Sequence, residues 1–105
     1  MAKSIAPSQT VISTISSQDI ENLFDVILQL ENVNEAKAFF RDLLTTAELC
    51  EFSNRWKVAH LLNQKMSYTE IEKQTGMSST TIARISKCLH GEAGGYRLML
   101  EKSEK

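Results

Sequence analysis

The sequence predicts an all-α protein, a six-helix fold built around a helix-turn-helix, and three observations lead to that prediction. Apolar residues recur at helical spacing in successive segments, and no segment alternates as a half-buried strand does. Serine or threonine stands ahead of several of these segments, where a helix cap is expected. A glycine separates two capped segments by a turn of only about four residues.

Length and composition are those of one soluble globular domain. The chain has 105 residues, of which 42% are hydrophobic and 24% are charged. No apolar run approaches the roughly 20 residues of a membrane span, and the N-terminus lacks the pattern of a signal peptide. Cys50 and Cys88 are too few and too far apart for a disulfide framework. We therefore expect buried, reduced thiols in a cytoplasmic protein.

The first 44 residues divide into a tail and two helices. Residues 1–16 are rich in Ser and Thr, contain the only proline and show no helical period, so a flexible tail is expected. The first helix is expected over 17–30, capped by Ser16 or Ser17, and the second over about 34–44. Their wide apolar stripes predict core, with some of the surface left for a dimer interface.

The third helix is expected to be the central one, and the last helix is short. Thr45 and Glu48 form a capping box ahead of a helix over about 46–63, which is apolar on more than one side. Trp56 in this helix is interpreted as a core or interface anchor. Three glycines at 91–95 predict a loop, which a helix over 96–102 follows.

The helix-turn-helix occupies about 67–90. Ser67 and Glu70 match a capping box for its first helix, and Ser78 precedes the second. Gly76 stands between them, where the turn requires a positive φ. The apolar positions that would lock the two crossed helices together are Ile71, Met77, Ile82 and Ile85. In proteins with this motif the second helix enters the major groove of DNA.

The second helix of the motif is polar and free of acidic residues, which favours contact with DNA. The candidate DNA-binding residues, which include one lysine of the preceding helix, are Lys73, Ser78, Ser79, Thr80, Thr81, Ala83, Arg84 and Lys87. The net charge of −1 is low for a DNA-binding chain. We therefore expect a homodimer, which doubles the contacts with double-stranded DNA.

Two other classes of function, an enzyme and a protein-interaction module, require different features of the sequence. An enzyme is not expected, because Cys88 and His90 lie about 200° apart around a helix and the other His and Cys lack a supporting acid. No paired ligand spacing indicates a metal site. A protein-interaction module that keeps the helix-turn-helix shape without DNA recognition is the alternative, and the near-neutral charge favours it.

From about residue 18 to 102 the chain resembles the Trp repressor superfamily, and its details are closest to the YerC/YecD-like branch. The residues that carry the resemblance are Leu44 to Glu48, Arg55, Val58-Ala59, Leu61-Leu62, Met66 to Ile71, Thr75-Gly76, Thr81-Ile82-Ala83-Arg84, Cys88-Leu89 and Gly95-Tyr96. The resemblance implies an intertwined, all-helical homodimer that binds operator DNA, with residues 17–105 as a single DNA-binding domain.

The resemblance also implies a corepressor site for tryptophan or another small amino-acid-like molecule. Carried over, its residues fall on Thr45, Arg55, Thr81 or Arg84, and Cys88. Three departures argue against tryptophan. Cys88 replaces a serine that hydrogen-bonds better, and Ile85 replaces a small glycine and fills space near an indole. The interval from Arg55 to the helix-turn-helix is also one residue shorter, which predicts that Arg55 points elsewhere.

Overall fold

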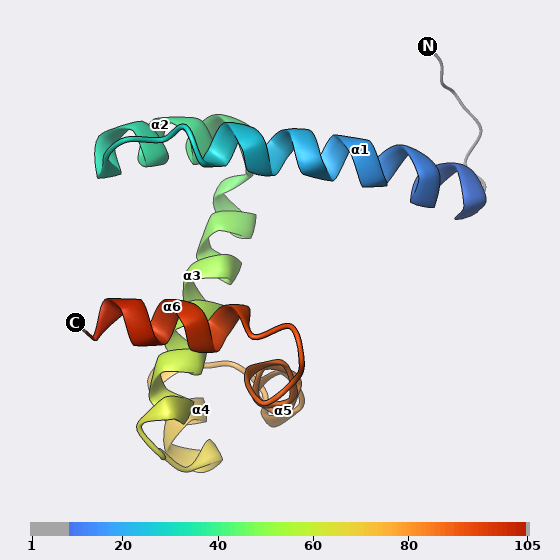
Figure 1. Cartoon of the computed structure of the whole chain (residues 1–105). Coiled ribbons are helices and arrows are strands. Elements are labelled where there is room, and N and C mark those ends of the chain that lie inside the picture. The colour runs from blue at the N-terminus through green and yellow to red at the C-terminus, as the bar shows by residue number, and fades with distance from the viewer. Residues whose placement is uncertain (1–8, 105) are drawn as a thin grey trace. The chain divides into compact units, whose positions relative to one another are not determined.

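The computed structural model describes residues 9–104, with side chains from Ser17 onward, and six helices lie in that range (Figure 1). They are α1 (Gln9–Ile27), α2 (Val33–Leu43), α3 (Thr46–Asn63), α4 (Tyr68–Thr75), α5 (Ser79–Leu89) and α6 (Gly95–Ser103). Residues 9–104 contain no strand, so the all-α prediction is confirmed. The chain divides into two compact units between Leu43 and Leu44. The single domain over 17–105 stays a prediction.

Helix α1 begins earlier than the sequence suggested. It starts at Gln9, so the expected boundary at Ser17 is wrong, and Ser16 and Ser17 lie within the helix. No glycine or proline interrupts residues 9–27. The serines, threonines and β-branched residues there each cost at most about 0.7 kcal/mol relative to alanine, so they do not end a helix. Residues 1–8 of the expected tail lie outside the described residues.

Helix α2 begins at Val33 because Asn32 caps it. The Asn32 side chain accepts a hydrogen bond from the Glu35 backbone N–H at 2.9 Å. Glu35 in turn accepts one from the Glu31 backbone N–H at 3.0 Å, so one unpaired donor of the first helical turn and one donor of the chain ahead of the cap are both satisfied. Asn32, one of the two asparagines that interrupt the apolar pattern, is therefore the cap of α2. The helix begins at Val33, one residue earlier than predicted.

The side chains that the structure describes in the first unit form no core of their own. None of the side chains described in residues 17–43 is buried, and several large apolar ones are more than 40% exposed. Leu28 is 83% exposed and Val33 is 68% exposed. The first unit therefore does not bury either apolar stripe by itself. The expectation that these stripes form core, with part of their surface left for a dimer interface, stays a prediction.

Helix α3 begins at the predicted residue, held by a complete capping box. Thr45 Oγ1 accepts from the Glu48 backbone N–H at 3.0 Å, and the Glu48 carboxylate accepts from the Thr45 backbone N–H at 2.9 Å. The helix ends at Asn63, and Lys65 then reverses the chain with a φ of 67°.

The helix-turn-helix is confirmed, and local contacts explain its shape. Ser67 caps α4 by accepting from the Glu70 backbone N–H at 3.2 Å. Gly76 ends α4 with a φ of 76°, the left-handed conformation that glycine adopts without strain. Thr75 stabilises the turn, because its hydroxyl donates to the Ile71 carbonyl and accepts from the Met77 N–H.

The core of the second unit joins α3, α4 and α5. Its buried side chains are Val58, Ala59, Leu61, Ile71, Ile82 and Ile85, and Leu62, Met66, Met77 and Tyr96 pack against them. All four residues predicted to lock the two helices together belong to this set. The helix-turn-helix is therefore braced from within its own unit, with α3 as the central helix.

Helix α6 closes the second unit. It follows the glycine-rich loop, in which Gly94 has a φ of 75°, and it buries Leu100. Arg97 donates to the Leu89 carbonyl at 3.3 Å, which ties α6 to the end of α5. Asn63 donates to the Glu104 carboxylate at 3.1 Å, which ties the end of α6 to the end of α3.

Candidate nucleic-acid interface

Helix α5 has one buried side and one exposed side. Ile82, Ile85 and Leu89 recur at helical spacing and are at most 5% exposed. At 3.6 residues per turn, the exposed residues Thr80, Ala83 and Lys87 fall on the opposite side. The 11 residues of α5 contain no acidic side chain. The helix thus offers a short, polar, acid-free surface to a ligand outside the chain.

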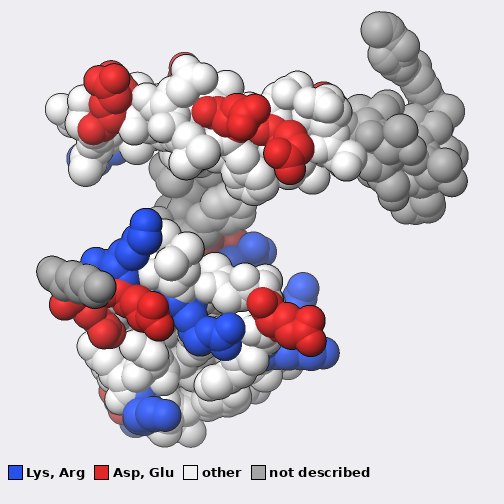
Figure 2. Space-filling view, viewed as in Figure 1, with Lys and Arg blue, Asp and Glu red and all other residues white. Residues whose placement is uncertain are grey.

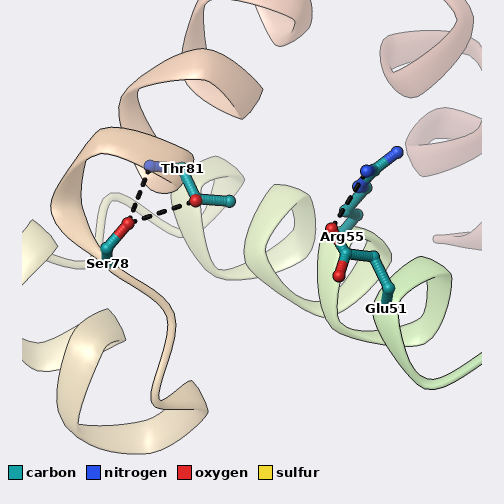
Figure 3. A network of polar contacts seen from close by, with 4 residues as sticks. All are labelled: Glu51, Arg55, Ser78 and Thr81. Atoms are coloured by element: carbon teal, nitrogen blue, oxygen red, sulfur yellow. Dashed lines mark hydrogen bonds and ion pairs between the residues drawn. The ribbon is translucent and has the colours of Figure 1, made fainter. Parts of the chain in front are cut away.

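The start of α5 is fixed by Ser78 and Thr81 (Figure 3). The Ser78 side chain accepts from the Thr81 backbone N–H at 3.2 Å and donates to the Thr81 hydroxyl at 3.1 Å. Because its hydroxyl is used within the chain, Ser78 orients the helix rather than offering a donor of its own. Ser79 and Thr80 follow it as exposed residues of the first turn.

The structure places most of the predicted DNA-binding residues at the surface. Seven of them are exposed, namely Lys73, Ser78, Ser79, Thr80, Ala83, Arg84 and Lys87. Thr81 is partly buried, because it lies on the flank of α5 that faces a cleft. Lys73 stands in the last turn of α4, on the helix that precedes the turn.

Charge is distributed unevenly between the two units. Residues 17–43 carry six acidic and two basic side chains, whereas residues 44–104 carry seven acidic and eight basic ones. Figure 2 shows acidic side chains along the first unit and basic ones, beside a few acidic ones, on the visible face of the second. The described part of the unit with the exposed, acid-free helix therefore has a slight excess of positive charge, whereas that of the first unit has an excess of negative charge, which repels a polyanion.

A cleft of about 160 Å³ lies within the second unit, between α3, α5 and α6. It is lined by Glu51, Arg55, Thr81, Arg84, Ile85, Cys88 and Tyr96. Four of the five predicted effector-binding residues therefore meet in one place: Arg55, Thr81, Arg84 and Cys88. Arg55 does line the cleft, so the expectation that it points elsewhere is wrong.

Thr45 does not join the other predicted effector-binding residues. Its hydroxyl caps α3, and it is absent from the lining of the cleft. Sequence reasoning missed Glu51 and Tyr96. A signal for Glu51 was available, because it stands four residues before Arg55, a spacing that pairs opposite charges on one helix face. Tyr96 had no comparable signal, since the glycine-rich loop decides where it lies.

Two oppositely charged side chains meet inside the cleft. Arg55 donates to the Glu51 carboxylate at 3.0 Å, and these side chains are 47% and 51% exposed (Figure 3). The Arg55 guanidinium also lies over the Phe52 ring, 5.6 Å from its centroid. Within the described residues, Arg84 has no acidic partner at ion-pair distance.

The cysteines, the possible metal ligands and the apolar character of the helices bear on the other expectations from the sequence. Cys50 and Cys88 are both exposed, so the expectation of buried thiols is wrong. Helical position explains the exposure of Cys88, which lies on the flank of α5 beside the cleft rather than on the buried side of the helix. No group of three or more His, Cys, Asp or Glu side chains that could hold a metal ion occurs in the part of the chain described. No helix there is long and apolar enough to cross a membrane.

Comparison with known proteins gives one family. The family model described as "Trp repressor protein" matches residues 18–104. The chain is 33% identical over 91 residues to the uncharacterized protein YerC of Bacillus subtilis (strain 168), a match that spans 87% of this chain and 88% of YerC.

Solved structures agree with that match. The crystal structure of a TrpR-like protein from Eubacterium eligens ATCC 27750 has a TM-score of 0.80 and 34% identity, and covers 88% of this chain and 95% of that one. A second crystal structure, of a protein from Staphylococcus aureus, also has a TM-score of 0.80 and 34% identity, and covers 89% of this chain and 93% of that one.

Proposed function

The chain belongs to the Trp repressor family, and on that premise we propose that it is a sequence-specific DNA-binding transcriptional repressor that acts as a homodimer. The observation that carries the proposal is the acid-free face of α5. A helix-turn-helix with its own buried core presents this face outward, opposite Ile82 and Ile85. In the motif this is the helix that enters the major groove.

The residues of α5 divide between two roles. Ser79 and Thr80 meet base edges or phosphates with their hydroxyls, and the small Ala83 lies against a thymine methyl. Lys73 and Lys87 contact phosphates, which adds affinity without sequence information. Ser78 contributes by capping the helix, and Arg84 adds a guanidinium at the edge of this surface.

A second copy of the chain completes the binding unit. The apolar side chains left uncovered in the first unit support this, because patches of that kind mark interfaces. Trp56 in α3 is 38% exposed, which supports its interpretation as an interface anchor rather than a core residue. Two recognition helices related by a two-fold axis address half-sites about 34–36 Å apart, so the operator is roughly palindromic.

Selection of bound sequences from random duplex DNA, at a stated salt concentration, tests the proposal. Enrichment of a palindrome by the full chain is the expected result. A protein-interaction module that keeps the helix-turn-helix without binding DNA is the alternative. It becomes the better account if no sequence is enriched at any salt concentration, with or without cell extract as a source of effector.

Single substitutions then separate the two roles. Lys73→Ala should weaken binding to all sequences and lower the salt dependence by about one unit of slope per subunit. Lys102→Ala, in α6, serves as the matched loss of one lysine outside the proposed contact surface. Replacing Thr80 or Ala83 by a bulky residue should instead change which sequences are preferred. Equal effects of all these variants on every sequence would contradict the assignment of roles.

Tryptophan is not expected to act as the corepressor. Ile85 is 5% exposed and lines the cleft, so its side chain occupies space that an indole needs. Calorimetry should detect no tryptophan binding at millimolar concentration. The double variant Ile85→Gly with Cys88→Ser is expected to gain weak binding. Saturable binding to the unaltered chain would show that Ile85 leaves room for the ring.

A further inference from the structure

The cleft beside the recognition helix holds an imbalance of charge, and of its charged residues only Arg84 belongs to the proposed DNA contacts. One carboxylate, that of Glu51, shares the cleft with two guanidinium groups, those of Arg55 and Arg84. The carboxylate pairs with Arg55 at 3.0 Å. Glu51 and Arg55 belong to α3, whereas Arg84 belongs to α5, so the pairing keeps the charge interaction within one helix.

Arg84 stands at the boundary between two surfaces. On α5 it lies in a row with Thr81 and Cys88, which line the cleft with it. That row is about 100° around the helix from the outward row of Thr80, Ala83 and Lys87. Arg84 is exposed, and its long side chain has the reach to turn toward the cleft or toward a ligand in front of α5.

We propose that Arg55 is a positioning residue that holds Glu51 away from Arg84 and so keeps Arg84 available for a DNA phosphate. This rests on the proposed function. Glu51 is the acidic side chain that lines the cleft together with Arg84, and opposite charges that share a cleft attract one another even near water. Arg55 satisfies that carboxylate locally, and the ring of Phe52 holds the guanidinium in place. Without Arg55, the carboxylate pairs with Arg84 across the cleft.

The size of the effect follows from the exposure of the groups. An ion pair between half-exposed side chains changes an equilibrium by up to about fivefold, and a dimer has two such clefts. We therefore expect Arg55→Gln to weaken operator binding by at least about threefold. Because the loss is that of a phosphate contact, the slope of log affinity against log salt should fall by about one unit per subunit.

The test is a double-mutant cycle in the full chain. Arg55→Gln is combined with Glu51→Gln, and the double variant is expected to recover wild-type affinity within about twofold, together with the wild-type salt slope. Arg55→Lys should keep both the wild-type affinity and the wild-type salt slope, since lysine retains the positive charge. Two controls make the same changes in charge outside the cleft. Lys57→Gln on α3 removes one positive charge, as Arg55→Gln does. Glu101→Gln on α6, introduced into the Arg55→Gln chain, removes one negative charge, as Glu51→Gln does.

A measurement without DNA separates this proposal from the proposed function. The side-chain N–H signals of Arg84 in NMR spectra should shift in Arg55→Gln and return in the double variant, since they report pairing with Glu51 directly. Two results overturn the proposal: Arg84 signals that do not respond, or a double variant that binds DNA as weakly as Arg55→Gln. A shift that appears and reverses as expected, in a wild-type chain that binds no DNA, confirms the pairing but contradicts the proposed function.

Discussion

Residues 17–43 and residues 44–104 differ in how they bury apolar side chains. Among the residues whose side chains the structure describes, eight hydrophobic ones are buried, and all of them lie in the second segment, from Val58 to Leu100. The first segment has a helical pattern of comparable apolarity but leaves Phe24 55% exposed and Leu28 83% exposed. Exposed apolar surface on this scale is unfavourable in water, so the difference supports the proposed homodimer, in which a partner completes the first unit.

Charge follows the same division. The complete unit carries the acid-free recognition helix and slightly more bases than acids, whereas the incomplete unit is acidic. The proposed function thus assigns assembly to the first unit and DNA recognition to the second. The predictions below test that assignment, since substitutions in the complete unit should act on folding and those in the other on association.

The largest effect is expected in the core of the complete unit. Ile82 is 0% exposed, so Ile82→Ala should lower the free energy of unfolding by about 2–5 kcal/mol in urea titrations. Leu28→Ala removes apolar volume at an exposed position of the other unit. Its effect should depend on protein concentration, because it acts through association. An unchanged free energy of unfolding in Ile82→Ala would show that the stability of the second unit does not depend on this core.

A smaller effect is expected at the turn of the helix-turn-helix. Gly76→Val should cost about 1–3 kcal/mol, because a β-branched residue is strained at a φ of 76°. Apart from its two neighbours in the chain, no residue comes within 4 Å of the position that a Cβ at Gly76 would take, so the cost comes from the backbone conformation. Gly95→Ala is the control, since its Cβ also meets open space but its φ is not in the left-handed region. Equal melting temperatures for the two variants would contradict this.

The smallest effect separates a structural serine from a DNA-contacting one. Ser78→Ala removes the cap of α5 and should lower stability by about 1 kcal/mol in thermal or chemical unfolding. Ser79→Ala, one residue later, should leave stability unchanged and reduce DNA affinity instead. The reverse pattern would mean that Ser79, rather than Ser78, fixes the start of the helix.

The sequence was most informative where local chemistry decides the structure. Thr45, Ser67 and Ser78 each cap a helix, and Gly76 makes the turn, because a short polar side chain or a missing Cβ acts on its own neighbours. The start of α1 was missed, since nothing in residues 9–16 except propensity marks it. Ser16 and Ser17 resembled caps but lie inside the helix.

The candidate site was only partly predictable for a related reason. Thr81, Arg84 and Cys88 are placed on one flank of α5 by helical spacing, which a sequence displays. Tyr96 reaches the same cleft through the loop before α6, and loop paths depend on tertiary contacts. The exposure of Cys50 and Cys88 was missed because residue type alone suggested burial. The apolar stripes of the first unit predicted core, but the first unit does not bury them by itself. The spacing of apolar residues identifies a helix face without revealing what covers it.

The central claim is that a second copy of the chain covers the first unit. Sedimentation equilibrium of the full chain at micromolar concentration tests this claim most directly. The predicted result is a species of twice the 11.8 kDa chain mass. Phe24→Asp, which puts a charge on the exposed stripe, should shift the protein to the single-chain mass while the second unit stays folded. A wild-type chain that sediments at 11.8 kDa at tens of micromolar would contradict the account.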